Sequence, residues 1–285
     1  MLKKLVLIDL DKTLVDQNYQ ITISIEKLHE TIRRARSHGL IVGLCSDSSA
    51  TTLSRIALEY GIEGPIIAER GAMIKIGEEE IRVIPDTVVF PDIRTSFINN
   101  YLELMVDDIL LVVGDVNQLS REFLSPTFSV RNTTAKTAVL INGSRKASLS
   151  FYVLANHNGR WKNDSAMLDE VSSQFITLGS KLAGAWWKDA FIEKNNDYGI
   201  GIIHHPNSEK TIALPILQDK FKIDEIWMIG DSMSDLLKQP RIQHAAVANA
   251  IPEFKSHCQL VSSQTFTAGV VELLEKLMSF DVKIN

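Results

Sequence analysis

Two aspartates directly after a short apolar segment constrain this chain more than any other feature. The run Leu5–Ile8 predicts a buried strand, and Asp9-Leu10-Asp11-Lys12-Thr13 follows it at once. Open α/β sheets place their chemistry at the carboxyl ends of their strands. One carboxylate there can attack phosphorus while the other moves a proton, and a magnesium ion can tie them together. If the segment were only a polar turn, we would expect no matching residues further along the chain.

Composition places the chain among ordinary globular proteins. Its 285 residues are 45% hydrophobic and 23% charged, which suits one large domain or two modest ones. The net charge of -5 argues against nucleic acid as the main partner, because proteins that bind its backbone usually carry a basic surplus. The two cysteines cannot form a disulfide framework, and no apolar run is long enough for a signal peptide or a membrane span. We therefore expect a cytoplasmic protein with no membrane partner.

The first part of the chain alternates predicted strands and helices. Ser24 is a candidate N-cap for a helix that runs to Arg36, and a second helix should end at Gly61. Further strands are expected at residues 40–45, 65–68, 73–76 and 81–84. The last two would form a hairpin with residues 77–80 as its turn. This order of elements predicts a doubly wound α/β fold, with a parallel sheet covered by helices on both faces.

The pattern changes in the middle of the chain. Residues 85–205 carry scattered turn signals, short apolar strands and one helical pattern, which is typical of an inserted α+β domain. The alternating part comprises residues 1–84 plus 206–285, so one interrupted core would carry one insert. After the insert, residues 210–221 predict a helix that Pro215 either kinks or starts late.

Later polar residues match the first aspartate pair, each at the tip of a predicted element. Ser46 follows the second strand, and Lys210 opens the helix after the insert. Asp231 and Asp235 follow the strand at 225–229. Phosphoryl transfer needs this combination, because a phosphate requires donors and positive charge while the metal requires hard oxygen ligands. As alternatives, Ser46 could cap a helix, and Asp235 could be a first-turn helix acid favoured by the helix dipole.

With these motifs in this order, the chain resembles the haloacid dehalogenase-like hydrolase superfamily, and within it the Cof and sucrose-phosphatase group. The resemblance covers residues 1–84 and 206–285, and the segments 67–72 and 246–250 also echo that group. It implies a Rossmann-like core with a large cap, residues 85–205, between the second and third motifs. It further implies a magnesium-dependent phosphatase that acts on a small phosphomonoester, such as a phosphosugar or a phosphoglycolate-like acid.

The resemblance also implies residue roles. Asp9 would be the nucleophile and form an aspartyl-phosphate. Asp11 would protonate the leaving group and then deprotonate the attacking water. Ser46 and Lys210 would bind the phosphoryl group. The implied Mg²⁺ ligands are Asp9, Asp11 through its main-chain carbonyl, Asp231 and Asp235, the last directly or through water.

Three residues depart from the pattern of that group. Asp47 follows Ser46 where relatives usually have glycine, while Arg70 and Ser234 stand where asparagine is usual. A carboxylate beside a phosphate pocket is unfavourable unless it points away, caps a helix or meets a cationic group of the substrate. These departures bear on substrate contacts rather than on the nucleophile or the metal.

Several residues of the insert are weaker candidates. Trp186-Trp187 could form an aromatic face for a sugar ring, but core packing or a hinge contact is the simpler interpretation. Adjacent histidines on a strand face opposite ways, so His204-His205 favours a domain-junction role over a metal pair. Gly114-Asp115 predicts a turn. Solvated surface positions are expected for Arg131, Arg145 and Arg160.

Other functions stay open at this point. A phosphosugar mutase would use the same nucleophile, but it needs a cluster of arginines in the insert, whose arginines are scattered in sequence. A phospho-ligand sensor without turnover is disfavoured by the intact acids, and a dehalogenase would make Asp11 and the metal acids superfluous. The sequence predicts a small-molecule phosphomonoester as partner and leaves the oligomeric state open.

Overall fold

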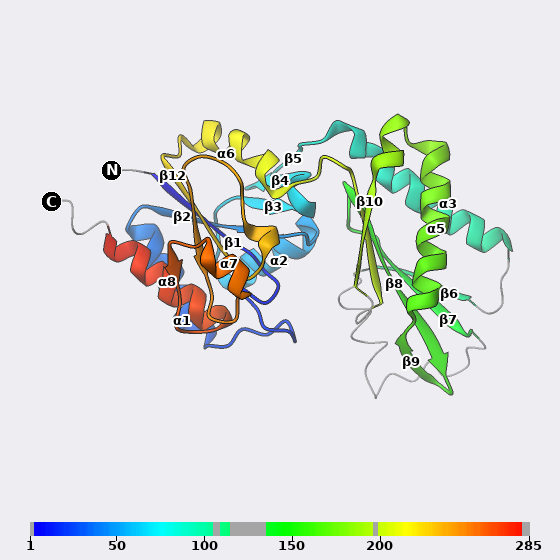
Figure 1. The fold of residues 1–285 in the computed structure, drawn as a ribbon, viewed down its shortest axis with the longest axis horizontal. Helices are drawn as coiled ribbons and strands as arrows, with labels where there is room; N and C mark the ends of the chain where they lie inside the picture. Colours follow the sequence, from blue (N-terminus) through cyan, green and yellow to red (C-terminus); the bar gives the residue numbers. More distant parts are fainter. Residues whose placement is uncertain (1–2, 105–108, 115–134, 196–198, 281–285) are drawn as a thin grey trace. The chain divides into compact units, whose positions relative to one another are not determined.

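The computed structural model describes residues 3–104, 109–114, 135–195 and 199–280 (Figure 1). By its internal contacts the chain divides into two compact units: Met1–Val83 with Glu209–Asn285, and Ile84–Ser208. Each unit has its own sheet and its own buried core.

An eight-stranded sheet forms the first unit, in the order β14-β13-β12-β1-β2-β3-β4-β5. Its strands are β1 (Lys4–Ile8), β2 (Leu40–Cys45), β3 (Ile66–Ala68), β4 (Met73–Ile76), β5 (Glu79–Arg82), β12 (Glu225–Gly230), β13 (Ile242–Ala246) and β14 (Leu260–Val261). All pairs from β14 to β3 are parallel, and β4 and β5 extend the sheet with two antiparallel pairs. The carboxyl ends of β12, β1, β2 and β3 therefore lie at one edge.

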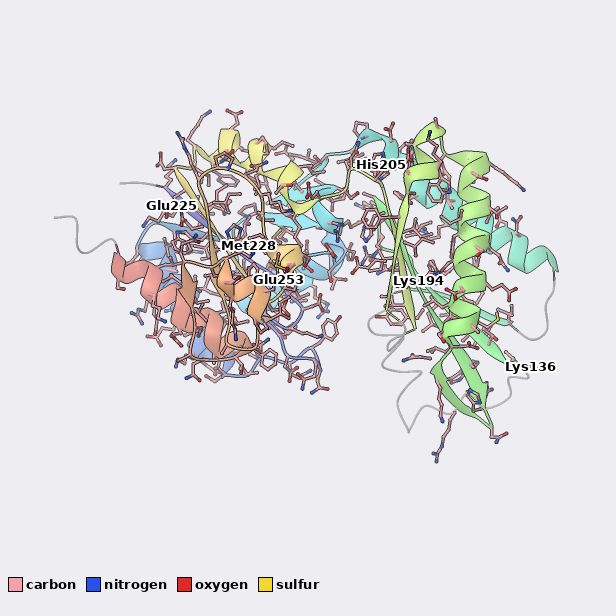
Figure 2. The ribbon with its side chains drawn as sticks, in the orientation of Figure 1. Lys136, Lys194, His205, Glu225, Met228 and Glu253 are labelled. Carbon is pink, nitrogen blue, oxygen red and sulfur yellow. The ribbon has the colours of Figure 1, made fainter. Side chains whose placement is uncertain are left out.

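Helices cover both faces of this sheet, which confirms the α/β class. They are α1 (Ile25–Ser37), α2 (Ala50–Tyr60), α6 (Leu214–Phe221), α7 (Pro252–Ser256) and α8 (Phe266–Phe280). Leu5 and Leu7 of β1 pack on one face, in a cluster that includes Leu214 of α6. Met228 of β12, labelled in Figure 2, belongs to the same cluster. Figure 1 shows α6 on one side of the sheet and the neighbouring helices α1 and α8 on the other.

Local signals set several element boundaries. Ser24 caps α1 as predicted, because its side chain accepts a hydrogen bond from the N–H of Lys27 at 3.3 Å. Gly61 ends α2 in the left-handed conformation, with φ 70°. Residues 210–213 form a 3₁₀ turn, and α6 then begins at Leu214. Pro215 thus lies in the first turn of α6, where a missing N–H has no intrahelical partner to lose.

The predicted register of the hairpin was wrong by two residues. The β5 strand begins at Glu79, so the turn consists of Gly77 and Glu78 rather than of residues 77–80. Gly77 supplies the positive φ of 59° that a two-residue turn requires. Because β5 ends the sheet order, its exposed Glu79 and Glu80 are tolerated, and charges there protect an edge strand.

The second unit is built on a mixed sheet in the order β10-β11-β8-β7-β6, with β9 paired to β8. Its elements are α3 (Phe90–Leu104), β6 (Ile109–Gly114), β7 (Thr137–Asn142), β8 (Ser148–His157), β9 (Arg160–Asn163), α5 (Ser165–Leu182), β10 (Phe191–Asn195) and β11 (Ile200–His204). Only β6 and β7 pair in parallel among these strands. Buried residues of α3, α5 and the sheet form one apolar cluster. In this cluster the ring of Phe97 stacks on the ring of Phe175, with 3.9 Å between the ring centroids.

The aromatic and histidine pairs of the insert lie within this second unit. Trp187 is 3% exposed in the core, and its Nε1 donates to the carbonyl of Ile176 at 2.8 Å. Trp186 packs against the same cluster, so core packing is confirmed for the tryptophan pair. His204 ends β11 and is fully buried. His205, labelled in Figure 2, lies 4.4 Å from the ring of Trp186, measured between centroids.

One further prediction for the insert is wrong. Arg145 is buried rather than solvated, because its guanidinium donates to the hydroxyl of Ser148 at 2.8 Å. Gly114 is the last residue of β6. Arg160 is exposed as expected. Asp115 and Arg131 lie outside the described residues.

Gly179 of α5 tests the packing of the second core. A Cβ at this position would lie 1.9 Å from Cε2 of Trp187, so Gly179→Ala must displace the indole ring. We expect this variant to lower the free energy of unfolding by about 1–3 kcal/mol in chemical denaturation followed by tryptophan fluorescence. The exposed neighbour Ser180→Ala is the control and should stay within about 0.5 kcal/mol of the native chain. Equal stability of the two variants would contradict the close contact.

Candidate active site

Three carboxylates converge at the carboxyl edge of the first sheet. Asp9 follows β1 and Asp231 follows the neighbouring β12, while Asp235 lies one short turn later. The N–H of Asp9 still donates to the carbonyl of Ile229 at 2.9 Å, which extends the pairing of the two strands up to the site. Each aspartate offers one oxygen, and these oxygens lie within 4.8 Å of one another. Asp9, Asp231 and Asp235 are called the acidic group below.

Lys210 connects two members of the acidic group. Its Nζ donates to Oδ1 of Asp9 at 2.9 Å and to Oδ1 of Asp235 at 2.7 Å. All three side chains are buried, so this ammonium is enclosed with its two partners. The 3₁₀ turn that begins at Lys210 packs on Gly71, where a Cβ would lie only 2.1 Å from the carbonyl oxygen of Glu209.

Asp235 also fixes the loop that carries Asp231. Its Oδ2 accepts hydrogen bonds from the N–H groups of Asp231, at 3.1 Å, and Ser232, at 3.3 Å. Ser232 and Asp235 form a reciprocal capping box. A Cβ at Gly230 would lie 2.3 Å from Oδ2 of Asp235, so this position requires glycine. Asp235 therefore fulfils both of the alternatives considered for it. Its Oδ2 accepts the two backbone hydrogen bonds, one of them within the capping box, and its Oδ1 accepts from Lys210 in the site.

The acidic group carries more negative charge than the protein neutralises nearby. Burial and the charge of Asp235 raise the pKa of Asp9 well above its usual value, although Lys210 opposes the shift. Burial alone would lower the pKa of Lys210, but Asp235 and Asp9 outweigh burial and raise it, so the lysine keeps its proton. Burial and the charge of Asp235 raise the pKa of Asp231 to about 6. Hard oxygen ligands with excess negative charge fit a divalent cation such as Mg²⁺.

The other two predicted site residues lie on adjoining loops. The carboxylate of Asp11 is partly exposed and is not a member of the acidic group, while its backbone bridges to Val15. Ser46 follows β2 and is buried, and its hydroxyl accepts a hydrogen bond from the N–H of Ser48 at 3.1 Å. Ser49 is the residue that caps α2, so the helix-cap alternative for Ser46 is wrong.

Sequence reasoning missed one contact in this region. Nη1 of Arg70 lies 3.5 Å from Oδ2 of Asp47, so the extra carboxylate beside Ser46 meets a cation of the protein itself. Both residues stood out in the sequence as departures from the related group. Their pairing was not visible there because 23 positions separate them in the chain.

The cysteines do not compete for a catalytic role. Cys45 lies at the end of β2 and is fully buried, which raises the pKa of its thiol and keeps it protonated. Cys45 and Cys258, both within the described residues, are free thiols. In the part of the chain that the structure describes, no helix has the length and apolar character needed to cross a membrane.

Comparison with known families now places the chain. A family model for haloacid dehalogenase-like hydrolases matches residues 6–274. The chain belongs to this family. Phosphoglycolate phosphatase from Staphylothermus marinus is 23% identical over 96% of this chain and 98% of that protein. Phosphoglycolate phosphatase from Thermoplasma volcanium is 23% identical over 95% of this chain and 96% of its own length.

Solved structures share the fold across the whole chain. A protein from Thermotoga maritima superposes with a TM-score of 0.62 at 21% identity, covering 97% of both chains. A haloacid dehalogenase-like hydrolase from Bacteroides thetaiotaomicron gives a TM-score of 0.59 at 16% identity, covering 96% of this chain and 99% of that one. The comparisons confirm the predicted family, the predicted fold class and the prediction of an enzyme, a phosphatase of the haloacid dehalogenase-like type.

The excess negative charge of the acidic group predicts that the stability of the fold falls as the pH rises when divalent cations are absent. The folded-state pKa of Asp231, about 6, exceeds its unfolded value of about 3.9, so folding favours the protonated form. Its contribution to stability is present at low pH and is lost as the pH rises through about 6. With chelator present, we expect Asp231→Asn to raise the free energy of unfolding at about pH 7.5 by about 1 kcal/mol, after allowance for solvent screening.

Urea denaturation at about pH 5 and about pH 7.5 measures this effect. Asp219→Asn is the matched control, because Asp219 is exposed and a hydrogen bond from Lys222 lowers its pKa, so it titrates below this range. The control should keep the pH dependence of the native chain. Loss of stability in Asp231→Asn at the higher pH would contradict the proposed excess of negative charge.

Proposed function

We propose that this protein is a magnesium-dependent phosphatase that hydrolyses a small phosphomonoester through an aspartyl-phosphate on Asp9. The observation that carries the proposal is the buried ammonium of Lys210 between Asp9 and Asp235, with Asp231 in the same group. A structural salt bridge would need one carboxylate for one ammonium. Here two carboxylates hold one ammonium and a third lies in the same group, which leaves ligands for a metal and a nucleophile in one place.

Asp9 and Lys210 prepare the attack in this mechanism. The ion pair fixes Oδ1 of Asp9, so its other carboxylate oxygen forms the bond to phosphorus. When bound by Asp9, Asp231, Asp235 and the carbonyl of Asp11, Mg²⁺ would supply positive charge that lowers the pKa of Asp9 and offsets the charge of the phosphate. Lys210 adds a fixed positive charge, and the hydroxyl of Ser46 donates to a phosphoryl oxygen.

Asp11 carries the proton in both half-reactions. As Asp9 bonds to phosphorus, the ester P–O bond breaks and Asp11 donates its proton to the departing alkoxide oxygen. Asp11 then accepts a proton from water, whose oxygen attacks phosphorus and releases Asp9 as a carboxylate and inorganic phosphate. The position of the Asp11 carboxylate outside the acidic group supports this role, since the proton then moves at a carboxylate other than those proposed to hold the metal.

The substrate class follows from the relatives. Those described above are phosphoglycolate phosphatases, so we propose a phosphoglycolate-like acid or a phosphosugar as substrate. In this proposal the core of residues 1–84 and 206–285 performs the chemistry, and the insert of 85–205 acts as a cap that contributes to substrate choice. The buried free thiol of Cys45 suits a reducing cytoplasm.

The nucleophile is tested by substitution. Asp9→Asn keeps the size of the side chain and removes the attacking charge, so kcat for phosphate release should fall about a thousandfold or more. Asp219→Asn on α6 is the control, because it removes an exposed carboxylate that does not belong to the acidic group. The measurement is phosphate release from a panel of phosphometabolites with magnesium present. Activity of Asp9→Asn within tenfold of the native enzyme would exclude Asp9 as nucleophile.

The metal is tested without reference to activity. Magnesium at a hundredfold excess over its dissociation constant should stabilise the fold by about 2.7 kcal/mol and raise Tm by several degrees. Because protons compete for Asp231, whose pKa is about 6, the shift in Tm should shrink between about pH 7.5 and about pH 5. Differential scanning calorimetry of the native chain and of Asp231→Asn measures it. An equal magnesium effect in both proteins would rule out Asp231 as a ligand.

A further inference from the structure

Arg70 lies on the same edge of the sheet as the acidic group, and the mechanism above gives it no task. The parallel strands β12, β1, β2 and β3 are neighbours, and Asp231, Asp9 and Ser46 follow the first three. Glu69 and Arg70 follow β3. Since neighbouring strands are about 4.8 Å apart, the ends of β3 and β1 are separated by about 10 Å. A long side chain at the end of β3 can therefore reach a ligand held at Asp9.

The backbone that presents Arg70 is unusual. Glu69 and Arg70 have φ values of 50° and 58°, and Gly71 follows with φ 86°. Left-handed conformations are unfavourable for residues with a Cβ, and such strain gathers at ligand-binding and catalytic positions. Two consecutive strained residues before the glycine thus point to a role beyond closing the turn between β3 and β4.

This turn packs directly on the lysine of the site. A Cβ on Gly71 would lie 2.1 Å from the carbonyl oxygen of Glu209 and 3.1 Å from Cα of Lys210. Arg70 is therefore one residue from a backbone contact with Lys210. Its guanidinium and the ammonium of Lys210 are cations on adjoining parts of one edge.

Asp47 sets the direction of the Arg70 side chain. The two side chains are 27% and 23% exposed, and the distance from Nη1 to Oδ2 is 3.5 Å. Partly exposed ion pairs contribute little to stability, so stability alone does not account for this pair or for the strained turn. Because Asp47 directly follows Ser46, the pair connects the ends of β2 and β3 beside the acidic group.

We propose that Arg70 is a specificity-determining residue that binds a carboxylate at the non-reacting end of the phosphomonoester, with Asp47 as its positioning residue. The inference rests on the proposed phosphatase function. A substrate with a carboxylate besides its phosphate would be repelled by the aspartates of this edge unless a fixed cation receives the second charge. The planar guanidinium suits that task, because its forked N–H groups match the two oxygens of a carboxylate.

The test compares two esters that differ in that one group: 2-phosphoglycolate and ethylene glycol monophosphate, in which a hydroxymethyl group replaces the carboxylate. For Arg70→Gln, kcat/KM should fall about 10- to 100-fold more for phosphoglycolate than for ethylene glycol monophosphate, through KM. Arg70→Lys keeps the charge without the fork and should recover part of the loss. Asp47→Asn should shift the ratio in the same direction by a smaller factor. Arg55→Gln, exposed on α2, is the control and should leave the ratio unchanged.

The outcomes distinguish a failure of the carboxylate assignment from a failure of the proposed phosphatase function. A native enzyme that hydrolyses both esters equally well, or an Arg70→Gln variant that loses both equally, would overturn the carboxylate assignment and leave the phosphatase intact. Absence of phosphate release from these esters, from p-nitrophenyl phosphate and from the panel of phosphometabolites, which includes phosphosugars, would overturn the proposed function itself. Circular dichroism and Tm of each variant show whether a loss of rate reflects a loss of fold.

Discussion

One buried ammonium between two carboxylates is the interaction on which the acidic edge depends. Lys210 enters after the insert, Asp9 comes from the first strand and Asp235 from the turn after β12, yet their atoms meet within 2.9 Å. Breaking a buried pair by removing one partner costs about 3–5 kcal/mol, because the remaining charge stays in the low-dielectric interior. The same ion pair therefore joins the first and last segments of the α/β unit and holds the nucleophile candidate in place.

Neighbouring contacts of the α/β unit hold these side chains close together. Parallel pairing of β1 with β12 brings Asp9 and Asp231 to neighbouring strand ends. The capping box of Asp235 holds the Asp231 loop, and Gly230 leaves room for that carboxylate. Gly71 allows the β3–β4 turn to approach the backbone of Glu209 and so supports the start of the Lys210 turn. Strand pairing, the capping box and the Gly71 contact thus hold side chains whose mutual repulsion would otherwise separate them.

The sequence was sufficient for the fold class and for most of the residues at the acidic edge. Apolar runs followed by aspartates indicated parallel strands with Asp9 and Asp231 at their ends, and strand pairing in the structure agrees. Contacts between distant side chains could not be read from local patterns, as the Asp47–Arg70 pair shows, and the burial of Arg145 was not visible either. The hairpin register failed because Gly77 alone decides the turn, while the glutamates after it suit either a loop or an edge strand. From the sequence, helix-end acid and site residue were alternatives for Asp235. The sequence does not reveal that one of its oxygens accepts from Lys210 and the other from a backbone N–H.

The most direct test of the account is to trap the phosphoryl group on the protein. Asp11→Asn removes the base that would activate water, while p-nitrophenolate leaves without a proton, so radiolabelled p-nitrophenyl phosphate should phosphorylate this variant and stop there. After an acid quench and peptide mapping, the account predicts label on the peptide that contains Asp9 and none when Asp9→Asn is added. Label on another residue, or phosphate release with no labelled protein at any time, would contradict it.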